Sequence, residues 1–223
     1  MDVGWRVSEL RGSAADLHGR ALPSSTGVAR AVEVLVIERP ALVLGSTQRM
    51  EEADLAAAAV LGVEVVRRRS GGGAVFLLPG QDLWVDITIP RTDPLWDDDV
   101  AASFHWLGRA WSAALGAVGL DGVVHTGRSR TSAWSRRVCF AGVGAGEVLV
   151  NGRKAVGLAQ RRTRDAARFQ CAVLRAWDPV TLLGLLALGE LERANGLVEL
   201  ADVATGVDVG PSALLDALRP ALP

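Results

Sequence analysis

The chain has 223 residues but only one lysine, no tyrosine and two cysteines. Two cysteines, Cys139 and Cys171, are too few for a disulfide framework, which predicts a reducing, cytoplasmic location. The other basic side chains are all arginine, so Lys154 stands alone among 24 basic residues. A lone lysine in such a chain is either a chance survivor or a residue kept for its chemistry.

The low net charge and the absence of long apolar runs, a signal sequence and metal-ligand spacings exclude several further classes of protein. The formal net charge is −1, so there is no basic field to attract nucleic acid. The longest apolar run, residues 181–189, is less than half of the ~20 residues that a membrane span needs. The first residues lack the basic and apolar regions of a secretory signal. The histidines are scattered and no Cys-x-x-Cys occurs, so no protein-held metal is predicted.

Apolar periodicity predicts more strands than helices. Helices are expected at 16–22, 51–62 and 97–119 and through much of the chain after residue 179. Strands are expected at 31–38, 41–45, 63–69, 74–78, 83–89, 122–127, 137–142, 147–152, 153–162 and 169–177. Arg39-Pro40 should join the first two strands, and Asn151-Gly152 should close a tight hairpin. We therefore predict an α+β fold, with a mixed, mostly antiparallel sheet flanked by helices, in one domain spanning residues 1–223.

A glycine-rich segment, RRRSGGGAVF at 67–76, is the first candidate for binding chemistry. Ser70, Gly71 and Gly72 follow a predicted strand, and backbone without Cβ atoms can approach a ligand closely. Its N–H groups can cradle a carboxylate or phosphate, and the preceding arginines add fixed positive charge. The plain alternative is a flexible turn, since the segment fits neither the Walker pattern nor GxGxxG.

The second candidate, NGRKAVGLAQRR at 151–162, holds the lone lysine. An ammonium at Lys154 could stabilise charge on a carboxylate or phosphate, although most lysines lie on the surface. Cys139 and Cys171 lie among strand-like residues, where a cysteine is more often a small buried hydrophobe than a nucleophile. For Cys139 a nucleophilic role would need a nearby base or cation, and Lys154 is the candidate.

The two segments, in this order and at this spacing, resemble lipoate–protein ligases and octanoyltransferases of the biotin/lipoate ligase-like superfamily. The resemblance runs from about residue 5 to residue 180. It implies that fold and a ligase that activates lipoate or octanoate with ATP and Mg²⁺, passing the acyl group to a lysine on a lipoyl domain. The lipoyl domain would belong to a 2-oxoacid dehydrogenase complex or a glycine-cleavage H protein.

The resemblance also assigns roles to individual residues. Lys154 is the expected essential lysine, and Gly157 and Ala159 should line the acyl slot. Nucleotide and acyl-adenylate contacts are expected from Arg68, Gly73, Ala74, Val75 and Phe76. No accessory C-terminal domain of typical size is expected, so a separate accessory subunit is a possible partner.

Three pairs depart from the family's pattern: Leu77-Leu78 stands for His-Asp, Gly80-Gln81 for Gly-Asn, and Gln170-Cys171 for His-Gly. Two alternatives to the ligase therefore stay open. One is an ATP-independent transferase that takes octanoyl from acyl carrier protein onto Cys139, with Lys154 beside it. The family's transferase branch has a nucleophile at about the place of Cys139, although its glycine motif reads more like Gly-Gly-Arg. The other is a non-catalytic protein that binds lipoate or an acyl chain.

Overall fold

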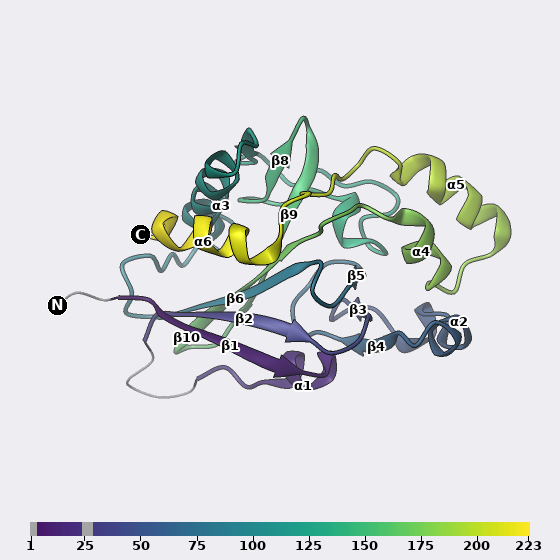
Figure 1. Cartoon of the computed structure of the whole chain (residues 1–223), viewed down its shortest axis with the longest axis horizontal. Coiled ribbons are helices and arrows are strands. Elements are labelled where there is room, and N and C mark those ends of the chain that lie inside the picture. The colour runs from purple at the N-terminus through teal and green to yellow at the C-terminus, as the bar shows by residue number, and fades with distance from the viewer. Residues whose placement is uncertain (1–3, 24–28) are drawn as a thin grey trace.

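The computed structural model describes residues 4–23 and 29–223, which form two sheets and six α-helices (Figure 1). In the large sheet the strand order is β1 (Arg6–Gly12), β2 (Ala31–Ile37), β6 (Leu83–Pro90), β10 (Ala166–Val173), β9 (Arg153–Arg162), β8 (Val148–Val150) and β7 (Gly122–Val124). The small sheet has the order β4 (Glu64–Arg67), β3 (Ala41–Leu44) and β5 (Val75–Leu77). The pairs β1–β2 and β3–β4 are parallel and all other pairs are antiparallel, which confirms the predicted fold class.

The helices lie around the sheets rather than between their strands (Figure 1). They are α1 (Ala14–Gly19), α2 (Leu55–Val60), α3 (His105–Ala117), α4 (Pro179–Gly184), α5 (Glu190–Leu200) and α6 (Pro211–Ala221). Three short 3-10 helices, η1 (Met50–Glu52), η2 (Ala102–Phe104) and η3 (Cys139–Ala141), lie in the connections.

One face of the large sheet is covered by α3 and α6, which lie side by side (Figure 1). Alternation along β6 explains this face, because Leu83, Val85, Ile87 and Ile89 all point into the same core cluster. The indole of Trp111 on α3 is fully buried in that cluster. Burying this face fixes the register of β6, so its other alternate residues must point to the opposite side.

The small sheet packs against that opposite side. Val43, Val75 and Leu77 from the small sheet share a core cluster with Trp84 from β6 and with Leu17 from α1. Two sheets that face each other in this way leave room for a ligand wherever their side chains do not meet. The candidate site described below lies in such a gap.

The strands expected at 31–38 and 41–45 are present and are joined through Arg39-Pro40 as predicted, although β2 lies in the large sheet and β3 in the small one. Two other local features differ from the prediction. Residues 137–142, expected as a strand, form the helical turn η3 after an isolated bridge between Ala74 and Val138. The edge strand β1 was not predicted, because its exposed outer position removes the apolar alternation that a buried face would impose.

The hairpin between β8 and β9 was predicted correctly. Asn151 and Gly152 both have positive φ, 51° and 77°, which asparagine and glycine tolerate best. Lys154 consequently lies at the start of the returning strand. Within the described residues, no helix combines the length and the apolar character needed to cross a membrane.

Candidate active site

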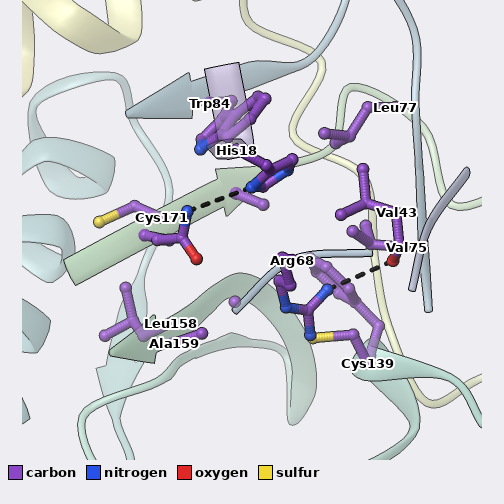
Figure 2. Close-up of a pocket in the computed structure, with 14 residues that line it drawn as sticks. His18, Val43, Arg68, Val75, Leu77, Trp84, Cys139, Leu158, Ala159 and Cys171 are labelled. Atoms are coloured by element: carbon purple, nitrogen blue, oxygen red, sulfur yellow. Dashed lines mark hydrogen bonds between the residues drawn. The ribbon is translucent and has the colours of Figure 1, made fainter. Parts of the chain in front are cut away.

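A pocket between the two sheets brings the two motifs together (Figure 2). The space between its lining side chains is about 400 Å³, part of which is open to solvent. Its lining comes from seven strands and helices and from Arg68: His18, Val43, Arg68, Val75, Leu77, Trp84, Cys139, Phe140, Gly157, Leu158, Ala159, Gln170, Cys171 and Ala172. A second, more open pocket adjoins it and shares Cys139, Leu158 and Ala159 with the first. The two pockets therefore meet at η3 and the middle of β9.

The glycine-rich loop is organised by Arg68, whose side chain is buried. Its guanidinium donates to the carbonyl oxygens of Gly71 and Gly73 at 2.8 and 2.9 Å and to that of Val43 at 3.3 Å. Arginine is suited to this because its rigid fork of donors can bind several acceptors at once. Most of the donors of Arg68 are therefore used within the protein.

The loop also binds the segment that carries Cys139. Gly73 lies so close to this segment that a Cβ would be 2.4 Å from the backbone nitrogen of Val138. The next residue, Ala74, donates its N–H to Arg137 at 2.7 Å and accepts the N–H of Cys139 at 2.8 Å. These contacts hold the start of η3 against the loop, so Cys139 is positioned by a segment more than sixty residues earlier in the chain.

The thiol of Cys139 lies partly buried at the junction of the two pockets. Its Sγ is 3.8 Å from Nη2 of Arg68, and a Cβ added at Gly72 would lie 3.6 Å from it. Arg68, which organises the glycine-rich loop, thus also donates to the sulfur of Cys139. No described residue accepts the backbone N–H groups of Gly71 to Gly73, and Gly72 is the glycine of this run that lies beside the thiol.

Lys154 is the opposite of a surface lysine, since only 2% of its side chain is exposed. Its ammonium lies 2.7 Å from Oε1 of Glu147 and donates to the carbonyl oxygens of Cys139 and Gly142 at 2.8 and 3.0 Å. It also lies 5.0 Å from the ring centre of Phe140. An ammonium has three N–H donors, and these three acceptors use all of them.

Glu147 is the partner that the sequence did not reveal. Its side chain is 5% exposed. Besides the ion pair with Lys154, Oε1 accepts the N–H of Leu158 at 2.9 Å and Oε2 accepts the N–H of Gly144 at 2.8 Å. A buried charge needs this complete pairing to be tolerated. Glu147 therefore neutralises the lone lysine and ties it to β9 and to the loop after η3.

Polar groups also gather on the sheet face at the other end of the first pocket. Asp86 is fully buried and forms an ion pair with Arg20 at 2.7 Å, and burial raises its pKa to about 6 against the opposing effect of nearby arginines. Gln170, which pairs with Asp86 across the strands, accepts a hydrogen bond from Ser70 at 2.5 Å. Burial, with neighbouring arginines, lowers the pKa of His18 to about 3, so this imidazole is neutral.

The predicted site residues fall into three groups. Arg68, Val75 and Gly157 line the first pocket, Gly71, Gly72 and Lys154 line the second, and Cys139 and Ala159 line both. Ser70, Gly73 and Ala74 hold the loop in place without lining either pocket. Phe76 points to the opposite side of β5 and lines a separate surface pocket, as its position next to Val75 on a strand requires.

Sequence reasoning did not find Glu147 or His18. Neither residue lies in the two recognised segments. Glu147 meets Lys154 through the pairing of β8 with β9, and His18 meets Gln170 and Trp84 because α1 packs on the sheet. The buried Cys171, by contrast, was predicted correctly as a structural residue, and burial raises the pKa of its thiol. Among the described residues, no cluster of three or more histidine, cysteine, aspartate or glutamate side chains could hold a metal ion.

Comparisons with known proteins agree with the two motifs and the fold. Two curated relatives are both named octanoyltransferase LipM. That of Carboxydothermus hydrogenoformans is 33% identical over 156 residues, covering 70% of this chain and 56% of the relative. That of Kyrpidia tusciae is 30% identical over 152 residues, covering 66% and 55%. The chain thus spans about half the length of the curated relatives it matches.

Solved structures share the fold. A bipartite lipoate protein ligase from Thermoplasma acidophilum, described with its E2 lipoyl domain, has a TM-score of 0.73 at 19% identity, covering 98% of this chain and 82% of that one. A lipoate-protein ligase A bound with ATP has a TM-score of 0.68 at 19% identity, covering 98% and 83%. The family model described as the lipoyl protein ligase A/B catalytic domain matches residues 23–205. The chain therefore belongs to the lipoyl protein ligase A/B catalytic-domain family, a family of enzymes that act on protein lysines.

Proposed function

We propose that this protein is an acyltransferase that carries a medium-length acyl group on Cys139 as a thioester and passes it to a protein lysine. The observation that carries the proposal is the position of the thiol, between a mainly apolar pocket suited to an acyl chain and a more open pocket that a partner could approach. The name of the two curated relatives, octanoyltransferase, supports an octanoyl group as the cargo.

The transfer has two steps. In the first, the sulfur of Cys139 attacks the carbonyl carbon of a carrier-bound thioester. The bond to Cys139 forms, the bond to the carrier's sulfur breaks, and the carrier leaves as a thiol with the proton that Cys139 gave up. In the second, the amine of an acceptor lysine attacks the new thioester. An amide forms, the bond to Cys139 breaks, and the proton lost by the amine returns to its sulfur.

The surrounding residues have roles that follow from their contacts. Arg68 lies next to Sγ of Cys139, where it can stabilise negative charge that develops on the sulfur during transfer. The free N–H groups of Gly71 and Gly72 lie at the second pocket and can stabilise the oxyanion that forms as the carbonyl carbon becomes tetrahedral. Lys154 donates to the carbonyl oxygens of Cys139, at the start of η3, and of Gly142, just after it, so in this enzyme it positions the nucleophile's segment.

ATP-dependent ligation of lipoate or octanoate is the second candidate, favoured by the Ser-Gly-Gly-Gly run and its free N–H groups. A triphosphate with Mg²⁺ needs several cationic donors. The donors of Lys154 are all used and most of those of Arg68 are engaged, while Glu147 adds a buried negative charge beside the lysine. These residues do not fit a nucleotide as they stand, which is why the transferase is preferred.

The proposed acceptor is a lysine on a lipoyl domain, of a 2-oxoacid dehydrogenase complex or of a glycine-cleavage H protein. Support comes from the bipartite ligase of similar fold, whose structure is described together with its E2 lipoyl domain. That protein is made of two parts, so a separate accessory subunit is a further proposed partner. The proposed acyl donor is acyl carrier protein.

The test is incubation with octanoyl-carrier protein and an apo lipoyl domain, without ATP, followed by intact-mass spectrometry. We expect the acyl group on the acceptor lysine, and a stable acyl adduct on Cys139 when the acceptor is omitted. Cys139→Ser should abolish both, while Cys171→Ser, which alters a thiol buried in the same wall, should retain the adduct.

Other outcomes point to the alternatives. Lipoate-dependent exchange of pyrophosphate into ATP, retained in Cys139→Ser, would refute the transferase and support the ligase. Acyl-chain binding without turnover in either assay would support a non-catalytic binding protein.

A further inference from the structure

His18 carries a polar atom in the first pocket that nothing described in the protein satisfies. The imidazole comes from α1, is 9% exposed, and stacks on the indole of Trp84 with ring centres 4.0 Å apart. Its Nε2 is buried and has no hydrogen-bond partner among the described residues. Figure 2 shows the ring beside Trp84, with its free edge turned toward Leu77 and Val43.

The neighbours of His18 decide which of its nitrogens holds the proton. The amide nitrogen of Gln170 lies 3.3 Å from Nδ1. Gln170 is held in this orientation because its oxygen accepts the hydroxyl of Ser70. An amide nitrogen only donates, so Nδ1 accepts and the neutral ring carries its proton on Nε2. The pKa of His18, lowered to about 3 chiefly by burial, keeps the ring neutral at physiological pH. Nε2–H is thus a fixed donor without an acceptor.

This donor lies far from the thiol along the pocket. Cys139 and Phe140 lie over β9, where a Cβ at Gly157 would meet the Phe140 ring at 3.2 Å. His18 lies over Trp84 on β6, and β10 separates the two strands. Two strand spacings correspond to roughly 10 Å across the sheet. Figure 2 likewise shows Cys139 and His18 at opposite ends of the lining, with Arg68 between them.

The wall between these ends is mainly apolar, with Val43, Val75, Leu158 and Ala172 among its residues. A plain alkyl chain would fill it but would leave Nε2–H buried and unpaired, which costs free energy. A site that buries a fixed donor discriminates in favour of ligands that supply the acceptor.

We propose that the acyl group carried by this enzyme bears a hydrogen-bond acceptor near its far end, which receives the Nε2–H of His18. The inference rests on the proposed acyl transfer, and it replaces the plain octanoyl chain, as the preferred cargo, by a chain of similar length with a polar group at its far end. His18 is then a specificity residue, and Gln170 positions it.

The experiment compares two carrier-protein thioesters of equal chain length, octanoyl and 7-oxooctanoyl, whose ketone accepts but cannot donate. One net hydrogen bond predicts a preference of about tenfold in kcat/KM for the ketone. His18→Phe, which keeps a ring against Trp84, should bring the two rates together. Gln170→Leu, which frees the tautomer, should reduce the preference as well. Val123→Thr is the control, because Val123 is exposed on β7 and lines neither pocket, so the ratio should stay as in the unaltered enzyme.

The two proposals can fail separately. If octanoyl is transferred as fast as 7-oxooctanoyl or faster, the proposed hydrogen bond from His18 to the acyl chain is wrong, while the proposed transferase activity stands. Turnover of neither thioester would refute the transferase. In that case calorimetric titration measures the affinity of the pocket for octanoate and for 7-oxooctanoate, and equal affinities would overturn the role of His18. Equal preference in His18→Phe and the unaltered enzyme would overturn it too.

Discussion

Replacing Glu147 by glutamine is the sharpest test of how the lone lysine is held. The carboxylate accepts from three donors: the ammonium of Lys154 at 2.7 Å, and the N–H groups of Leu158 and Gly144. A glutamine has one acceptor oxygen and one NH₂ group. In either orientation of the glutamine amide, its NH₂ group faces at least one of these three N–H donors and cannot accept from it. The substitution also leaves the buried ammonium without a counter-charge.

The expected cost is large because both partners are buried. Removing one member of a buried ion pair typically costs about 3–5 kcal/mol, and we expect Glu147→Gln to lower the free energy of unfolding by that amount. Lys154→Met should be destabilising for the same reason. In the double variant neither charge remains, so the total loss should be smaller than the sum by at least ~1–2 kcal/mol.

Urea denaturation of the four proteins in this cycle measures these energies. Glu192→Gln is the matched control, since Glu192 pairs with Arg137 at the surface, where both side chains are more than 40% exposed. That substitution should cost about 0–1 kcal/mol. A loss below about 1 kcal/mol for Glu147→Gln, or additive losses in the double variant, would refute the buried-pair reasoning.

Three further predictions follow from single contacts. Iodoacetamide should modify Cys139 well before Cys171, because Cys139 is partly exposed beside an arginine. Cys171 is buried, and burial raises the pKa of its thiol. Peptide mass spectrometry measures the labelling, and equal labelling of the two cysteines under native conditions would contradict this prediction. The unfolded chain protonates His18 near its ordinary pKa of 6.5, whereas in the folded protein the pKa of His18 is about 3. The free energy of unfolding should therefore fall as pH drops below 6.5. Relative to His18→Phe, the fall should be up to about 1.4 kcal/mol per pH unit. Urea denaturation at several pH values measures this, and parallel pH curves would count against it. Gly73→Ala should destabilise by ~1–3 kcal/mol, since its Cβ would lie 2.4 Å from a backbone nitrogen, whereas Gly71→Ala faces open space and should cost less than ~1 kcal/mol in thermal or urea unfolding.

The elements that sequence reasoning found are those with a strong local signal. The alternation of β6, the Asn151-Gly152 turn and the long periodic helix α3 are each set by neighbouring residues, so period and turn chemistry suffice to predict them. The strand expected at 137–142 failed for the opposite reason. Its backbone meets the glycine-rich loop in a single isolated bridge between Ala74 and Val138, so no strand ladder continues and Cys139–Ala141 form a helical turn.

The sequence by itself determined the α+β class, the two motifs and the importance of Lys154 and Cys139 as residues to examine. These depend on composition and spacing along the chain. Only the tertiary structure showed that Lys154 is buried and neutralised by Glu147, that Cys139 lies where two pockets meet, and that His18 keeps a free donor at the far end. Such facts depend on strand register and on contacts between segments far apart in sequence, which a local pattern does not encode.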